Sequence, residues 1–324
     1  MADQSEANDE PEVIEIRFTV EPAYDGWRLD RYLQLRIKRL SRTRIAEICR
    51  QVLTLNDAGV RKPGVRVRRG DRILIRRPAP PEREVPRHFD ELARGPGYLA
   101  VHKPAGLPVH PTAHYLNNTL TALVRERYGL DSGLNMAHRL DRETSGIVLF
   151  GTHPASTRAL KLAFQDGLVH KRYLALVHGD LADPCVVEAP IGPAPGSVIR
   201  LRMGVRPDGQ ASRTEIEPLE RFGDHTLVQA RPRNGRQHQI RVHLEHLGHP
   251  VVGDKLYGHP DSFFLTIVNH GGVPPDLQGA LEIDRHALHA AAIRFPLPDG
   301  SGKEARVQAP LPNDIEALIA RLRR

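Results

Sequence analysis

Residues 138–146 read HRLDRETSG, and five of these nine side chains can carry charge. The four residues that follow, 147–150, are all apolar, which predicts a strand whose two faces are both covered. A loop at the end of a buried strand is a common place for a functional site. A cation near Asp141 would lower its pKa by roughly 1–3 units and keep the carboxylate ionised, as a nucleophile or a general base requires.

The same aspartate could instead be a turn or capping residue that pairs with Arg139 or Arg142. The sequence RLDR also occurs at 28–31, where it reads as the start of a helix. These residues alone therefore do not identify a catalytic site, and the surrounding segments must decide.

A second polar cluster, NGRQHQIRVHLEHLGHPVVGDKLYG, spans 234–258. The pattern predicts a helix over 235–248, with Arg236 and Arg241 near its start, which is typical of an anion or phosphate site. Four histidines, at 238, 243, 246 and 249, raise the alternative of a metal site. Their spacing matches H-E-x-x-H poorly, and Glu245 would point away from the histidine pair.

A Pro/Gly-rich loop, VHKPAGLPVHPT, spans 101–112. Its Lys103 and His110 could contact phosphates or simply stand in solvent. The chain has no G-x-S-x-G, P-loop or G-x-G-x-x-G motif, so three common enzyme classes lack their signatures.

Basic charge is concentrated near the start of the 324-residue chain. The formal charge is −7 for residues 1–26, +12 for residues 27–77 and +2 for the remainder. Such asymmetry favours a polyanionic partner, here nucleic acid. Two cysteines allow no disulfide framework, no apolar run has membrane-spanning length, and the acidic first residues are unlike a signal peptide, so we expect a cytoplasmic protein.

Four segments are predicted along the chain: an acidic, disordered tail (1–26), a basic module (27–77), a proline-rich linker (78–87) and a large domain (88–324) that carries the candidate site. The basic module should contain two helices, the second capped by Ser41, followed by short strands. The large domain should mix strands at 98–102, 146–151, 172–178 and 225–231 with a helix over 154–167.

Several segments together resemble the RluA-type pseudouridine synthases, which isomerise uridine to pseudouridine in RNA. The matching segments, in the family's order, are LAVHKPAGLPVHP, HRLDRETSG, KRYLALVHG and NGRQHQIRVHLEHLGHPVVGDKLYG. The resemblance covers roughly residues 88–312 and implies an α+β fold with a central mixed, mostly antiparallel β-sheet flanked by helices and loops. The basic module resembles the S-four-type RNA-binding domain, a small α/β domain, with Arg28, Arg42 and Arg44 on that domain's pattern.

The resemblance also implies residue roles. Asp141 would be the catalytic carboxylate, Arg241 its partner, and Tyr173 the ring that stacks on the target base. Arg139 would enter the RNA helix and fill the gap left by the flipped uridine. The other expected RNA-contacting or base-contacting residues are His138, Ile240, Arg236 and Lys103. The family's TGRTHQIR is NGRQHQIR here, which implies altered RNA contacts.

The implied reaction involves no redox change, so we expect no cofactor and no metal. The expected partner is RNA, most simply large-subunit ribosomal RNA. We also expect the protein to be a monomer and to contact no membrane. Transfer RNA as substrate, a non-catalytic RNA-binding protein of ribosome assembly, and a metal-dependent hydrolase of nucleic acids remain alternatives. Asp141 could attack the sugar's anomeric carbon or remove the neighbouring sugar proton, and both routes need an ionised carboxylate.

Overall fold

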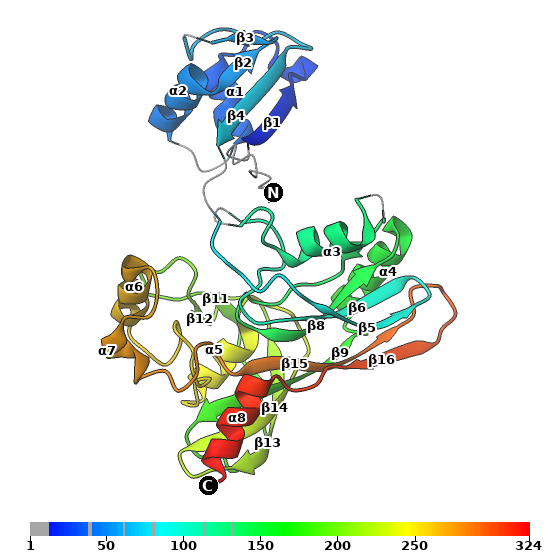
Figure 1. The fold of residues 1–324 in the computed structure, drawn as a ribbon, viewed down its shortest axis with the longest axis vertical. Coiled ribbons are helices and arrows are strands. Elements are labelled where there is room, and N and C mark those ends of the chain that lie inside the picture. The colour runs from blue at the N-terminus through cyan, green and yellow to red at the C-terminus, as the bar shows by residue number, and fades with distance from the viewer. Residues whose placement is uncertain (1–12, 38–40, 61, 79–81, 113–114, 131) are drawn as a thin grey trace, which may run out of the picture. The chain divides into compact units, whose positions relative to one another are not determined.

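The computed structural model describes residues 13–37, 41–60, 62–78, 82–112, 115–130 and 132–324. The chain divides into two compact units, Met1–Glu82 and Arg83–Arg324. The two units are described separately (Figure 1). Among the described residues, none of the helices is both long and apolar enough to cross a membrane.

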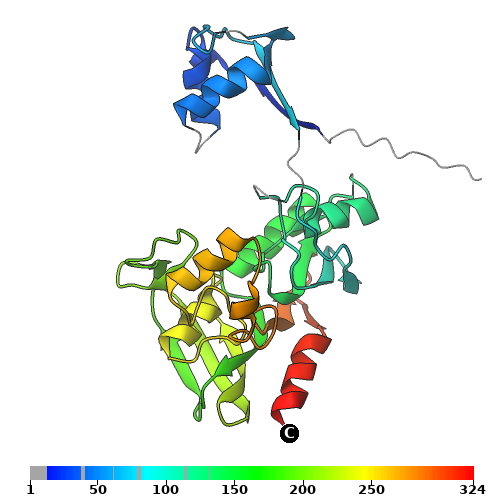
Figure 2. The ribbon, with the colours of Figure 1, turned by 60° about the vertical axis from the view of Figure 1, so that its left-hand side comes forward.

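The first unit is a four-stranded antiparallel sheet with two helices. The strand order is β1 (Val13–Thr19), β4 (Arg72–Pro78), β2 (Leu53–Leu55) and β3 (Ala58–Gly59). The helices α1 (Leu29–Arg36) and α2 (Arg42–Gln51) lie on the same face of this sheet (Figure 2). Leu33, Ile45 and Ile73 are among the residues of the shared core. Ser41 caps α2 as predicted, since its side chain accepts a hydrogen bond from the Arg44 amide.

The prediction of a disordered tail through residue 26 is wrong for residues 13–26. Residues 13–19 form β1, which pairs with β4 along its whole length, and a short 3-10 helix, η1 (Pro22–Tyr24), follows. Ile14, Ile16 and Phe18 alternate with exposed positions, a period of two that the acidic composition concealed. Residues 1–12 lie outside the described residues.

The second unit is built on a ten-stranded mixed sheet with the path order β10-β13-β14-β9-β15-β8-β6-β5 (Figure 1). Strands β16 and β7 extend it by pairing with β15 and β8. The strands are β5 (Asp90–Gly95), β6 (Tyr98–Lys103), β7 (Asn135–Met136), β8 (Ser145–Gly151), β9 (His170–His178), β10 (Cys185–Glu188), β13 (Arg213–Arg221), β14 (His225–Pro232), β15 (Leu288–Pro296) and β16 (Glu304–Gln308). Strands β15 and β8 pair in parallel and the other pairs are antiparallel, which confirms the expected mixed, mostly antiparallel sheet.

Strand β8 is buried along all seven residues, as its unbroken apolar run predicts. Val148 and Phe150 pack into one core cluster, and Ile147 and Leu149 pack into another on the opposite face. Covering both faces fixes the register of β8, because a slip by one residue would exchange the two sets of side chains. The loop that carries Asp141 therefore leads into one of the most constrained strands of the sheet.

Six helices and a small hairpin complete the described part of the second unit. The helices are α3 (Leu120–Tyr128), α4 (Pro154–Gln165), α5 (Gln239–His246), α6 (Asp261–His270), α7 (Pro275–Gln278) and α8 (Asn313–Leu322), and β11 (Ile191–Pro193) pairs with β12 (Met203–Val205). The helix expected over 235–248 is shorter than predicted. His238 takes a left-handed backbone conformation (φ 56°), so the chain before α5 is a turn.

Candidate active site

A cavity of about 420 Å³ lies where three segments of the second unit meet. Its size is within the usual range for small-ligand sites, about 300–1,000 Å³. The loop before β8, the start of β9 and the segment between β14 and α5 provide most of its wall. The lining includes His138, Arg139, Asp141, Lys171, Tyr173, Asn234, Arg236, His238, Ile240, Arg241 and Leu288.

Asp141 and Arg241 meet in this cavity, although 100 residues separate them in sequence. Arg241 Nη1 donates to Asp141 Oδ2 at 2.9 Å. The Asp141 side chain keeps 24% of its surface exposed, whereas Arg241 keeps 8%. A reacting group in the cavity can therefore reach the carboxylate while the guanidinium stays enclosed.

Asp254, a residue that sequence reasoning missed, binds the two guanidinium nitrogens of Arg241 that do not contact Asp141. Arg241 Nε and Nη2 donate to the two Asp254 oxygens at 2.6 and 2.8 Å. Asp254 Oδ1 also accepts from the backbone amides of Leu256 and Tyr257 at 2.9 and 3.0 Å. A bidentate pair fixes the plane of a guanidinium, so Asp254 determines where Arg241 Nη1 points. The only hint in the sequence is an aspartate in an apolar stretch, VVGDKLY.

The charge balance of the site favours ionised carboxylates. Burial alone would raise the pKa of Asp141, but the positive charges of His238, when protonated, and of Arg241 outweigh burial and lower it. Burial lowers the pKa of His238 to about 4, so this ring is neutral near pH 7. For Arg241, burial alone would lower the pKa, and the charges of Asp254 and then Asp141 outweigh it and raise the pKa. Arg241 is therefore the permanent cation beside Asp141.

The loop that carries Asp141 is fastened to the segment around β15 by its two hydroxyl residues. Thr144 Oγ1 lies 2.7 Å from His286 Nε2, and Ser145 Oγ lies 2.9 Å from His289 Nδ1. Gly146 has φ +118°, and a Cβ there would collide with the backbone of Ala290. The sequence TSG is thus explained by two buried hydroxyl contacts and one close backbone approach.

Tyr173 provides an aromatic wall of the cavity. It lies on β9, where it pairs in register with Ala230 of β14 and Ala290 of β15. Burial, followed by the charge of Asp141, raises the pKa of the Tyr173 phenol, so the side chain stays neutral. Ile240 and Leu288 add apolar surface to the same cavity. An aromatic and aliphatic wall beside a carboxylate suits a flat base.

Lys171, two residues before Tyr173, is a cavity residue that was not predicted. Its Nζ donates to the Asn234 carbonyl at 2.5 Å, and burial lowers its pKa to about 8. Arg139 and Arg236 are exposed and line the cavity as well. Arg139 makes no side-chain ion pair with any residue in the described ranges. These three cations give the cavity mouth a positive character.

Lys103 was expected to contact RNA, and the structure shows that this expectation is wrong. Lys103 is 0% exposed, and its Nζ donates to the carbonyls of Pro104, Leu107 and Arg142 at 2.8–3.0 Å. All three ammonium donors are therefore used inside the protein, where they hold the 104–107 loop against the Asp141 loop. Burial lowers the pKa of Lys103 to about 7.

His138 lines the cavity, but it has a structural contact as well. Its Nε2 accepts the Leu149 amide at 3.1 Å, and its ring packs at 4.6 Å from that of Phe164. Burial lowers its pKa to about 3, so the ring is neutral. Any contact of His138 with a ligand must therefore use the ring face or the other nitrogen.

The basic residues expected in the first unit are all exposed. Arg28 pairs with Asp30 at 2.7 Å, and Arg44 pairs with Glu47 at 2.9 Å. Arg42 is the first residue of α2. Exposed pairs of this kind contribute little to stability, so an anionic ligand can compete for the arginines.

The histidines near α5 do not form the metal site considered above. Both ring nitrogens of His243 are engaged, with Thr214 Oγ1 at 2.8 Å and the Ala189 carbonyl at 3.0 Å. His249 Nδ1 contacts the His178 carbonyl, and Glu245 accepts from Arg202. These contacts explain the polar residues of the helix without a metal.

Comparisons with known proteins identify relatives of this chain. A family model described as RNA pseudouridylate synthase matches residues 97–246. The chain is 34% identical over 311 residues to an uncharacterized RNA pseudouridine synthase of Chloroflexus aurantiacus, covering 94% of this chain and 92% of that protein. It is also 34% identical to the ribosomal large subunit pseudouridine synthase D of Xanthomonas campestris pv. campestris, covering 100% of this chain and 96% of that protein.

Among solved structures, human RNA pseudouridylate synthase domain containing 4 matches with a TM-score of 0.55 at 25% identity. That match covers 72% of this chain and 92% of the human chain. The expected catalytic fold is therefore confirmed.

Proposed function

Because the chain belongs to the RluA-type RNA pseudouridine synthases, which are isomerases, we propose that it converts specific uridines of structured RNA to pseudouridine with Asp141 as the catalytic carboxylate. The observation that carries this proposal is the 2.9 Å contact between Asp141 and Arg241 inside a cavity with an aromatic wall. Arg241 keeps the carboxylate ionised, and Asp254 keeps Arg241 in place.

The reaction breaks the bond between uracil N1 and the ribose anomeric carbon, rotates the base and rejoins it through ring carbon 5. The proton lost from carbon 5 is balanced by one gained at N1, so the product is an isomer of the substrate. Asp141 either attacks the anomeric carbon or removes the proton of the adjacent sugar carbon, and an ionised Asp141 serves both routes. Tyr173 and Ile240 hold the detached uracil while it turns.

The target base must leave its stack to reach Asp141, which costs a few kcal/mol. Tyr173 offsets part of this cost by stacking on the base, and Arg139 offsets another part by filling the vacated space in the RNA. Arg236 and Lys171 provide positive charge for the neighbouring phosphates.

Large-subunit ribosomal RNA is the proposed substrate. The Xanthomonas relative is named for the ribosomal large subunit and matches the whole chain. The first unit is proposed to act as an S-four-type RNA-binding domain, in which exposed arginines such as Arg42 bind phosphates. A cytoplasmic location and a monomeric state remain predictions.

The test is pseudouridine mapping of total RNA from cells that lack this gene, complemented with the wild type, Asp141→Asn or Glu143→Gln. Glu143 is the matched control, because it is a carboxylate of the same loop, its side chain is 16% exposed and it pairs with Lys255. We expect the wild type and Glu143→Gln to restore sites in large-subunit RNA and Asp141→Asn to restore none, although it remains folded.

Restoration by folded Asp141→Asn would refute the catalytic role of Asp141. Sites confined to transfer RNA would refute the substrate, and unchanged RNA in the deletion strain would refute the function as a whole.

A further inference from the structure

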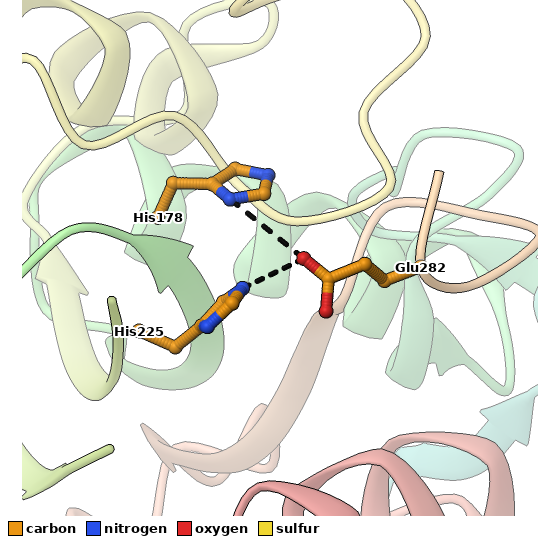
Figure 3. A group of neighbouring side chains, drawn as sticks. All are labelled: His178, His225 and Glu282. Atoms are coloured by element: carbon orange, nitrogen blue, oxygen red, sulfur yellow. Dashed lines mark hydrogen bonds and ion pairs between the residues drawn. The ribbon is translucent and has the colours of Figure 1, made fainter. Parts of the chain in front are cut away.

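Three side chains that can bind a metal meet at the ends of two neighbouring strands of the second unit, outside the Asp141 cavity (Figure 3). His178 ends β9, His225 begins β14, and the two residues are register partners. Glu282 comes from the 279–287 segment, between α7 and β15. One ligand atom from each residue lies within 4.8 Å of the other two.

A single carboxylate oxygen lies between the two imidazoles. Glu282 Oε1 is 2.7 Å from His225 Nε2 and 3.9 Å from His178 Nδ1. In a tetrahedral zinc site with metal–ligand bonds of about 2.0–2.1 Å, neighbouring ligand atoms are about 3.3–3.4 Å apart. One of the two observed distances is shorter than that value and the other is longer. A shift of well under 1 Å by Glu282 Oε1 would therefore place it about 3.3–3.4 Å from both imidazole nitrogens, as in a zinc site.

The surroundings fix the ligands without occupying their ligating atoms. The His178 backbone is held on both sides, since its amide donates to Pro250 and its carbonyl contacts His249 Nδ1. Arg321 lies 3.8 Å from the other oxygen of Glu282 and donates to the Glu282 carbonyl. Partners that orient a ligand from outside are the usual second layer of a metal site.

We propose that His178, His225 and Glu282 bind one divalent ion of the zinc type, with a fourth position open to water. Two imidazoles and one carboxylate are a donor set that suits Zn²⁺ and Co²⁺. The side chains are 40%, 13% and 28% exposed, so an ion can reach them from solvent.

The ion would act as a cross-link and take no part in the isomerisation. His178 lies five residues beyond Tyr173 on β9, about 16 Å away at about 3.3 Å per residue. The ion would instead stabilise the 279–287 segment. Glu282 in that segment lies four residues before His286, which contacts Thr144 of the Asp141 loop. Without an ion, a hydrogen bond joins His225 to Glu282, and His178 Nδ1 lies 3.9 Å from the same Glu282 oxygen.

The test uses the full chain, stripped of metal with a chelator and titrated with Zn²⁺ by calorimetry. We expect one equivalent to bind and the Tm to rise by about 5–10 °C at a free Zn²⁺ concentration of 100 times Kd. Co²⁺ should give the visible absorption of a tetrahedral site, and Zn²⁺ should abolish it. Because the Co²⁺ spectra are recorded on the wild type, they test the site even if a variant fails to fold.

His225→Gln and Glu282→Gln should each weaken Zn²⁺ binding at least about 100-fold, since even the loss of outer partners weakens metal sites by 10–100-fold. The control is His246→Gln, an exposed histidine outside the cluster, which should bind as the wild type does. Absence of a one-equivalent transition, or equal Zn²⁺ binding by folded Glu282→Gln, would refute the site. Pseudouridine formation by the metal-free protein should persist, so this result and that of the Asp141 test are independent.

Discussion

The Asp254→Asn substitution tests whether the site depends on a residue that does not line its cavity. Asp254 accepts two hydrogen bonds from Arg241 and two from backbone amides, and its side chain is 0% exposed. Asparagine keeps one acceptor oxygen, which can serve the bonds now made to Oδ1. Its NH₂ group then faces Arg241 Nε, so a donor meets a donor where a 2.6 Å bond now exists.

The cost follows from burial. Removing one partner of a buried ion pair costs about 3–5 kcal/mol, and Asp141 still compensates part of the Arg241 charge, so we expect about 3 kcal/mol. A loss of about 3 kcal/mol lowers the Tm of a unit of this size by roughly 6–12 °C. A displaced Arg241 should also lower kcat by about 100-fold, the usual effect of a shift of about 1 Å in a catalytic group. KM should change little, because Asp254 makes no contact with the cavity.

The assays are thermal unfolding and single-turnover pseudouridine formation on an RNA fragment that the wild type modifies. Asp314→Asn is the matched control, because Arg285 donates to Asp314 with the same two-bond geometry, at 2.7 and 2.8 Å. The Asp314 side chain is 44% exposed, so water can replace the lost acceptor and the cost should be at most about 1 kcal/mol. A wild-type kcat for Asp254→Asn, or an equal loss for Asp314→Asn, would contradict this reasoning.

Further predictions concern pH and the first unit. Pseudouridine formation should not vary between about pH 5 and about pH 7, since the pKa of Asp141 is lowered and this group is already ionised; a single-turnover inflection near pH 6.5 would disagree. Burial lowers the pKa of Lys171 to about 8, so this side chain becomes neutral above that pH and the wild type should lose RNA affinity. The RNA affinity of Lys171→Met, measured by filter binding, should not change with pH in the same range. Burial lowers the pKa of His286 and His289 to about 4, so the unfolded chain binds more protons between pH 4 and 6.5. Stability should therefore fall as pH drops through that window, and equal Tm values at pH 7 and pH 5 would contradict this. A chain of residues 83–324 should stay folded by circular dichroism but bind RNA more weakly and with a smaller salt slope, whereas loss of folding would contradict the two-unit division.

The sequence was most informative where the structural signal is local. The unbroken apolar run at 147–150 predicted a strand covered on both faces, and β8 is buried throughout. The proline-led pattern from Pro154 predicted a helix, and α4 begins there. Strand β1 carries an equally local signal in the alternation of Ile14, Ile16 and Phe18, but the small number of apolar residues in 1–26 predicted a disordered tail instead.

The site could be predicted only where a known family provides the distant contact. Composition and spacing cannot bring Asp141 and Arg241 together, because the contact depends on the order of strands in the sheet. Asp254 was missed for the same reason, since a turn after α5 brings it back to Arg241. Lys103 was misassigned because a lysine in a basic loop looks exposed in sequence, while its three carbonyl partners exist only after the loops have packed.

The position of β15 has a consequence for the order in which this enzyme is made. β15 lies between β9 and β8, yet it begins at Leu288, after both of its neighbours. Until the ribosome has released that segment, the sheet exists at most as two parts, each with an unpaired edge that can capture other chains. Asp141 precedes β8 in one part and Tyr173 lies on β9 in the other. A nascent chain therefore assembles the proposed active site only when β15 is inserted, and chains that stop before Leu288 are candidates for aggregation and should have no residual activity.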